Sequence, residues 1–297
     1  MMLKSQFFNT FSLKLIFFST IFCLILNFAL GELIKNLLIF SGILSFGVIH
    51  GANDLILLKK KLNNKEITIF SLFFPYLSMV FLFGLFFYFF PSFALIFFVL
   101  FSSYHFGEQQ WTMFIKKKEK KLRVFYFSFG LFLFSVLFWI NSQSVINIIN
   151  DITGVLIISV FFDYLLGLSM VGLLFFGFLN YRLLIDQIIV QFILLVLLTL
   201  LFFNSDLIYA FGVYFVFWHS IPSILEQSNF IFGSSDIKSF ISYLRYAFLY
   251  WILSLIGLFI LYYFLKDHQN LLLSIFFSFL AAITFPHTIV IFKIKGN

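Results

Sequence analysis

Four of the five histidines lie inside long apolar stretches of the sequence, with other polar residues beside them. An ionisable side chain in such a setting is costly, so it is usually paired or functional. A single histidine there commonly does no more than hydrogen-bond two helices together, but four of them favour a metal site. Neutral imidazole suits iron, copper, zinc or haem iron. The short segments that contain the histidines are Phe46–Asp54 with His50, Ser102–Trp111 with His105, Trp218–Gln227 with His219, and Phe285–Thr288 with His287.

Carboxylates follow two of these histidines at helical spacing. Asp54 comes four residues after His50. Glu108 comes three residues after His105, so each carboxylate shares a helix face with its histidine. We predict that Asp54 and Glu108 hold the imidazole N–H that does not bind the metal. The spacing also allows both to be metal ligands or charges at helix ends.

Further polar residues have weaker signals. Glu226 follows the third histidine by seven residues, close to the expected membrane surface, where a solvated role is equally compatible. Tyr104 and Trp111 are candidates for the wall of a cavity, with ordinary packing as the alternative. Asp163 and Asp186 have no histidine nearby and are candidates for pairing helices.

The composition requires that these residues be positioned by membrane helices. The chain has 297 residues, of which 62% are hydrophobic and 10% charged, and its mean hydropathy is +1.08. Soluble domains carry about 25% charged residues, so soluble, disordered and nucleic-acid-binding classes are excluded. The single cysteine, Cys23, excludes internal disulfides and paired-thiolate metal sites.

We therefore predict an all-α fold, a polytopic membrane bundle formed by one domain over residues 1–297. About ten apolar stretches are long enough to span a bilayer. They are 13–30, 34–58, 67–90, 92–115, 124–140, 152–179, 183–203, 207–227, 243–265 and 271–291.

The basic residues predict the orientation. The lysine-rich runs 59–65 and 116–123 each join two spans, so both loops and both termini are expected in the cytoplasm, for a multi-pass protein of the cell inner membrane. The same rule explains these loops without a nucleic-acid partner. The four histidine-bearing spans then run in one direction, with each histidine about 9 to 15 Å before the cytoplasmic end. The imidazoles are thus expected at one depth.

Two regions qualify this topology. The stretch 141–180 could hold one span after an interfacial helix or two short spans, and we favour one because two would place five downstream basic residues outside. His268 lies in a polar loop, 266–270, and is expected to be solvated.

Small residues and prolines mark the histidine stretches. Gly47, Gly51 and Gly107 would allow close approach of helices. Pro222 and Pro286 would kink two spans and release carbonyls around a cavity. Several enzyme classes are excluded, because the chain lacks the HxxxH and HxxHH groups of membrane di-iron desaturases, the HExxH zinc motif, the GxGxxG fold signature and a P-loop.

The histidine motifs resemble those of the Brp/Blh family of membrane beta-carotene 15,15'-dioxygenases. The resemblance covers residues 50 to 287 in the order and approximate spacing of the family. It rests on His50-Gly51-Ala52-Asn53-Asp54, Tyr104-His105-Phe106-Gly107-Glu108-Gln109-Gln110-Trp111, Trp218-His219-Ser220-Ile221-Pro222 and Pro286-His287.

This resemblance implies a non-haem Fe(2+) held by histidines, O2 as cosubstrate, and cleavage of the central double bond of beta-carotene into two retinal molecules. It implies His50, His105 and His219 as ligands, and a functional link to a retinal-binding rhodopsin. The third motif departs from the family where Ser223 replaces a second histidine. We therefore assign His287 as the fourth ligand from its expected depth and orientation.

The residues alone leave two other functions open. A haem-binding electron-transfer protein would use histidine pairs on facing helices as axial ligands. A proton-coupled transporter would use the histidines with Asp54, Glu108 and Glu226 as a protonatable chain.

Overall fold

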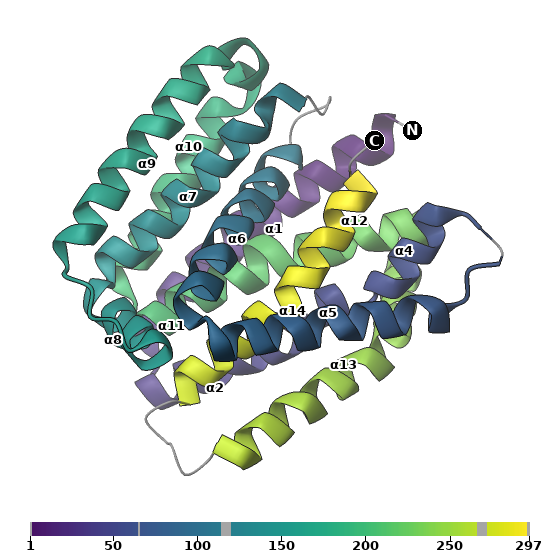
Figure 1. Cartoon of the computed structure of the whole chain (residues 1–297). Helices are drawn as coiled ribbons and strands as arrows, with labels where there is room; N and C mark the ends of the chain where they lie inside the picture. The colour runs from purple at the N-terminus through teal and green to yellow at the C-terminus, as the bar shows by residue number, and fades with distance from the viewer. Residues whose placement is uncertain (1, 65, 114–119, 266–271, 296–297) are drawn as a thin grey trace. The chain divides into compact units, whose positions relative to one another are not determined.

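The computed structural model describes residues 2–64, 66–113, 120–265 and 272–295, and within these stretches the chain forms helices and no strand. Figure 1 shows the helices in chain order. They are α1 (Met2–Ala29), α2 (Glu32–Gly42), η1 (Ile43–Gly47), α3 (Val48–Ala52), α4 (Asp54–Leu62), α5 (Ile69–Phe89), α6 (Pro91–Thr112), η2 (Lys120–Leu122), α7 (Arg123–Ile140), α8 (Ser142–Thr153), α9 (Val160–Leu179), α10 (Tyr181–Asn204), α11 (Leu207–Val213), η3 (Tyr214–Ser220), α12 (Ile221–Phe232), α13 (Ile237–Leu265) and α14 (Leu272–Lys295).

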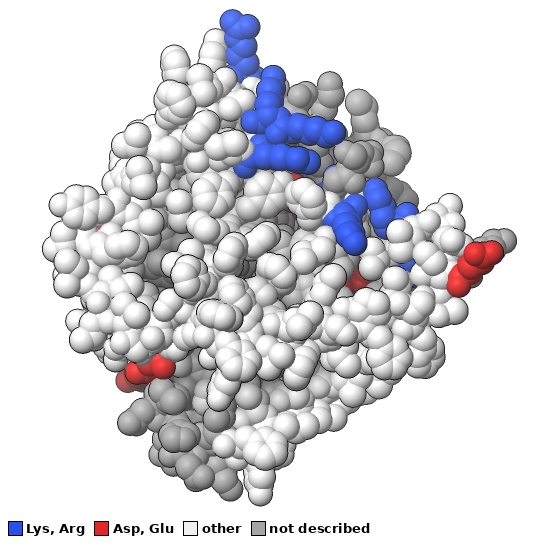
Figure 2. Space-filling model, in the orientation of Figure 1, with Lys and Arg blue, Asp and Glu red and all other residues white. Residues whose placement is uncertain are grey.

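The predicted all-α membrane bundle is confirmed. Among the described residues, nine helical segments are long and apolar enough to cross a bilayer. The remaining predicted span, 92–115, corresponds to α6, a helix of 22 residues whose second half carries the polar histidine motif. Most of the described surface visible in Figure 2 has no acidic or basic side chain, and many large apolar side chains are exposed. Such a surface suits lipid rather than water.

The stretch 141–180 contains one span, as we favoured. The segment α8 has 12 residues, too few to cross a bilayer. Its strongly one-sided distribution of apolar residues is typical of a helix that lies at the membrane interface. The span itself, α9, begins at Val160 rather than at Ile152, because residues 154–159 form no helix.

The stretch expected as one continuous span at 34–58 is interrupted. The helix widens into the π-helical segment η1, and it breaks at Asn53, between α3 and α4. Asn53 lies outside the α-helical region, with φ −95° and ψ 14°. Its side chain is fully buried and donates a hydrogen bond to the backbone oxygen of Tyr243 at 2.9 Å. This contact stabilises the break inside the protein.

The chain divides into two compact units, of which the first comprises residues 1–43, 102–146 and 158–222. In this unit α7, α9 and α10 lie side by side (Figure 1), α1 packs on α10, and α11 packs on α2. The part of α6 that belongs here approaches α7 very closely. A Cβ at Gly107 would lie 1.9 Å from the backbone oxygen of Tyr126, and one at Gly130 would lie 1.8 Å from that of Ser103.

The second unit comprises residues 44–101, 147–157 and 223–297. Here α14 packs on α4 and α5, and α13 packs on α3 and α14. Phe285 packs against a hydrophobic cluster formed by Phe83, Phe87, Ala94 and Ala281. Before α13, the exposed Asp236 accepts a hydrogen bond from the backbone N–H of Ser239 at 2.8 Å, and this bond lowers the carboxyl pKa. The expectation that residues 1–297 form one domain stays a prediction.

Candidate metal centre

All four predicted ligand histidines are deeply buried. The exposed fractions are 4% for His50 and 2% for each of His105, His219 and His287. Two of them lie at irregular points of their helices. His50 is in the short α3, between η1 and the break at Asn53, and His219 is inside the π-helical segment η3. Such π-helical turns occur frequently at functional sites.

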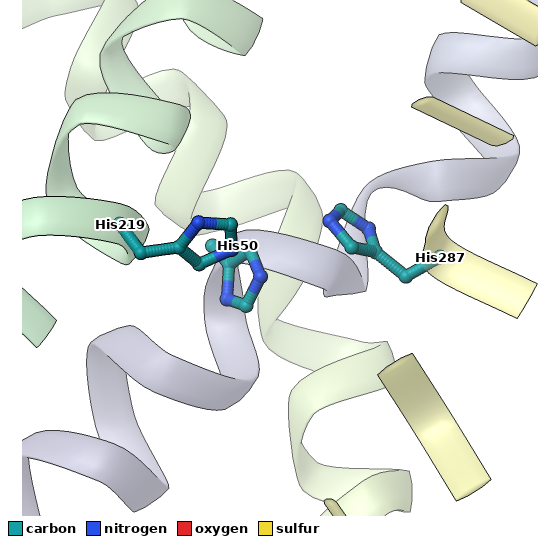
Figure 3. Close-up of side chains that lie close together, drawn as sticks. All are labelled: His50, His219 and His287. Atoms are coloured by element: carbon teal, nitrogen blue, oxygen red, sulfur yellow. The ribbon is translucent and has the colours of Figure 1, made fainter. Parts of the chain in front are cut away.

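In the second unit, His50 and His287 form a pair. Their ring centroids are 4.7 Å apart and the ring planes are nearly perpendicular, at 84°. Figure 3 shows the two side chains extending toward each other from α3 and α14. Gly51 lies beside this pair, because a Cβ there would be in van der Waals contact with Nδ1 of His287, at 3.4 Å.

A buried carboxylate fixes the orientation of His287. Nδ1 of His287 lies 2.8 Å from Oδ1 of Asp54, and the hydroxyl of Tyr76 donates to the other carboxylate oxygen at 2.8 Å. Asp54 is 1% exposed. Nδ1 of His287 is therefore the ring nitrogen that the carboxylate engages. A metal bound to this ring would then be bound by Nε2.

His50 is also engaged through Nδ1. Its Nδ1 contacts the backbone oxygen of Gly47, within the preceding turn. Because a carbonyl oxygen is an acceptor, Nδ1 of His50 is the donor, and Nε2 is the nitrogen suited to a metal. Both rings of this pair therefore have the second contact that metal-binding histidines usually make.

The contact of Asp54 differs from the one expected from the sequence. Four-residue spacing placed Asp54 on the helix face of His50, but the helix breaks at Asn53, directly before Asp54. The carboxylate meets His287, which is remote in the sequence. The sequence analysis also missed Tyr76; its only signal is a polar hydroxyl in an otherwise apolar span.

In the first unit, His105 and His219 form a second pair. Their ring centroids are 4.8 Å apart and the planes meet at 77°. The ring of Phe106 lies 4.2 Å from that of His219, and Phe215 stacks on His219 at 5.7 Å. Gln109 donates from Nε2 to the backbone oxygen of His219 at 2.8 Å. His219 is also drawn in Figure 3.

The remaining polar candidates have identified contacts. Glu108 accepts a hydrogen bond from the hydroxyl of Tyr104 at 3.0 Å. Glu226 forms an ion pair with Lys295, with 3.5 Å between the charged atoms. Asp163 accepts from the indole N–H of Trp139 at 2.8 Å, a contact between α7 and α9. Trp111 packs its ring on Phe125 and Phe129.

Ser223, where the third motif departs from the family, is buried and accepts a hydrogen bond from Gln227 at 2.8 Å. It belongs to a polar network rather than to the histidine pairs. His268, predicted to be solvated, lies outside the described residues.

Comparison with known proteins agrees with these motifs. The family described as beta-carotene 15,15'-dioxygenase matches residues 41–295, which is most of the chain and includes all four buried histidines. No match was found among curated proteins or solved structures. The match confirms the resemblance seen in the histidine motifs, and the chain belongs to the beta-carotene 15,15'-dioxygenase family.

Proposed function

We propose that this protein binds Fe(2+) through histidines and cleaves beta-carotene at its central 15,15' double bond with O2, giving two retinal molecules. The observation that carries the proposal is the family match over a chain whose buried histidines are arranged in two pairs. The proposed ligands are His50, His105, His219 and His287.

The donor set fits this metal. Imidazole nitrogen suits iron, and a carboxylate or carbonyl on the second ring nitrogen is the usual support for a metal-binding histidine. Asp54 and the backbone oxygen of Gly47 supply that support in the second unit. Within the second unit, the buried His50 and His287 could provide two of the ligand atoms. Iron bound there would activate O2 and stabilise negative charge on oxygen without a protein proton donor.

The protein's own residues have separate roles in this proposal. The histidines hold the metal through ring nitrogens, Asp54 holds the N–H of His287, and Tyr76 holds Asp54. Tyr104 and Glu108, which contact each other, are proposed to line a substrate cavity rather than to bind the metal.

Aromatic side chains next to the histidines suit a long apolar polyene. Phe285, two residues before His287, stacks on Phe83 with ring centroids 4.1 Å apart, and its ring also contacts Phe101 at 5.1 Å. In the first unit, Phe106 and Phe215 contact His219. Such walls exclude water and bind apolar ligands. A carotene dissolved in membrane lipid would enter laterally, and the retinal formed would supply a rhodopsin in the same inner membrane.

The test is expression in a bacterial host that accumulates beta-carotene, followed by chromatography of the extracted pigments. We expect loss of carotene and formation of retinal, with neither change in a matched strain that carries His287→Ala at equal membrane abundance. Longer apocarotenals would contradict central cleavage. Unchanged carotene would contradict the proposed substrate, and a Soret absorption band in the purified protein would then identify a haem protein.

A further inference from the structure

In each unit, a side chain from another helix holds the backbone oxygen of a histidine. The amide Nε2 of Gln109, on α6, donates to the backbone oxygen of His219 at 2.8 Å. The hydroxyl of Tyr243, on α13, lies 2.9 Å from the backbone oxygen of His50. Gln109 and Tyr243 have exposed fractions of 2% and 0%, so both contacts are shielded from solvent.

The helix break explains why His50 needs such a contact. The last four carbonyls of an α-helix have no donor within the helix, and α3 ends at Ala52. The backbone oxygen of His50 is one of these four. The hydroxyl of Tyr243 also lies 3.5 Å from the backbone oxygen of the preceding residue, Ile49. Water cannot donate hydrogen bonds to these oxygen atoms inside an apolar bundle, so a side chain donates instead.

A similar irregularity surrounds His219. It lies in the π-helical segment η3, where the regular α-helical hydrogen-bond pattern is interrupted. The donor that the structure shows at its backbone oxygen is the side-chain amide of Gln109. Gln109 is four residues after His105 on α6, so both side chains lie on one helix face. That face therefore carries His105 and also the donor to the backbone oxygen of His219.

Tyr243 is itself held by a buried polar network. Asn53, at the helix break, donates to the backbone oxygen of Tyr243 at 2.9 Å. The hydroxyl of Tyr243 lies 2.7 Å from Oε1 of Gln227, whose amide donates to Ser223 at 2.8 Å. The residue that replaces the family histidine thus takes part in holding Tyr243. The single hydroxyl proton of Tyr243 is shared between the backbone oxygen of His50 and Oε1 of Gln227.

We propose that Gln109 and Tyr243 are positioning residues: each holds the backbone at one histidine and thereby sets the direction of its imidazole toward the metal. The inference rests on the proposed metal-binding function. A histidine carried by a broken or π-helical turn has a less constrained backbone than one inside a regular helix. Small displacements of a ligand weaken a metal site, so the donor to the backbone contributes to affinity.

The variants Gln109→Met and Tyr243→Phe remove the donors and keep the side-chain volume nearly constant. The chain offers a matched control for each. Gln110→Met changes the neighbouring buried glutamine, whose amide bonds Gln191 at 3.0 Å. Tyr209→Phe removes a buried hydroxyl that donates to the backbone oxygen of Cys23 at 2.7 Å. Neither control contacts a histidine in these hydrogen bonds.

The measurement is anaerobic titration of the metal-free, purified protein with Fe(2+), and separately with Co(2+), whose visible spectrum reports ligand geometry. We expect the two positioning variants to bind Fe(2+) about 10- to 100-fold more weakly, as is typical for loss of an outer contact of a ligand. Their Co(2+) spectra should differ from the wild type, while both controls keep the wild-type affinity and spectrum. A lowered melting temperature alone would not change the spectrum.

The outcomes separate this inference from the proposed function. If the wild type binds metal and both positioning variants match it in affinity and spectrum, the inference is wrong and the proposed function stands. If the wild type binds neither ion, the metal-binding function itself fails. If Gln109→Met does not fold, Gln109→Leu replaces it, because its apolar side chain also lacks the amide N–H. Wild-type metal binding by that variant would likewise overturn the role of Gln109.

Discussion

Nδ1 of His287 lies 2.8 Å from Oδ1 of Asp54, with both side chains almost fully buried. The pair joins α14 to the start of α4, directly after the break at Asn53. A carboxylate in this position holds the imidazole through Nδ1 and leaves Nε2 to face a metal. Asp54 therefore connects the helix break at Asn53 to His287, a proposed metal ligand.

Replacing Asp54 with asparagine should weaken iron binding. Asp54→Asn keeps the shape but removes the charge that holds the N–H of His287, and we expect about 10- to 100-fold lower affinity for Fe(2+). The measurement is iron titration of the metal-free protein. Asp163→Asn is the control, because Asp163 accepts a similar bond from Trp139. Equal affinity in the Asp54 variant and the wild type would contradict this role.

Removing the hydroxyl of Tyr76 should have a smaller effect in the same direction. Tyr76→Phe takes away one of two contacts of Asp54 and leaves the carboxylate on His287. We expect a loss of iron affinity below that of Asp54→Asn, measured in the same titration. Tyr88→Phe is the control on the same helix, since Tyr88 is 79% exposed. A loss as large as that of Asp54→Asn would mean that Tyr76 acts on the metal directly.

An alanine at Gly107 should destabilise the first unit. Its Cβ would lie 1.9 Å from the backbone oxygen of Tyr126, so α6 and α7 must separate, at a cost of about 1–3 kcal/mol. The measurement is the melting temperature in detergent. Gly84→Ala is the control, because no atom lies within 4 Å of a Cβ there. Equal melting temperatures would show that the two helices do not pack as closely as described.

Phe285 should contribute to carotene binding rather than to iron binding. Phe285→Ala removes the ring that stacks on Phe83, and an aromatic contact is worth about 0.5–1.5 kcal/mol, a factor of about 2 to 12 in KM. Retinal formation by purified protein gives KM, and elemental analysis gives iron content. Phe264→Ala, at a side chain that is 76% exposed, is the control. Loss of iron in Phe285→Ala would place this residue with the metal ligands instead.

The membrane fold and the histidine positions could be predicted because they depend on local composition. A run of apolar residues identifies a membrane span by its length and composition alone, and a histidine inside such a run is easily recognised. The pairing of the histidines was not predictable in this way, since His50 and His287 are brought together only by packing of α3 against α14.

The contacts that hold the histidines depend on irregular backbone, which the sequence signals poorly. Nothing in the residues around 43–47 indicates a π-helical turn, and nothing at Asn53 indicates the helix break that precedes Asp54. The contact of Asp54 with His287 could therefore not be predicted from helical spacing. Tyr76 and Tyr243 are separated from their partners Asp54 and His50 by 22 and 193 residues. Contacts of this kind become visible only in three dimensions.

The most direct test of the central claim is the iron content of purified protein and of two double variants, one for each histidine pair. We propose from the sequence motifs that all four histidines bind one Fe(2+), so the wild type should contain one iron per chain. Both His50→Ala with His287→Ala and His105→Ala with His219→Ala should then lose it while still inserting in the membrane. Two irons per chain, with one retained in each double variant, would show that the pairs bind separate ions and would contradict the account.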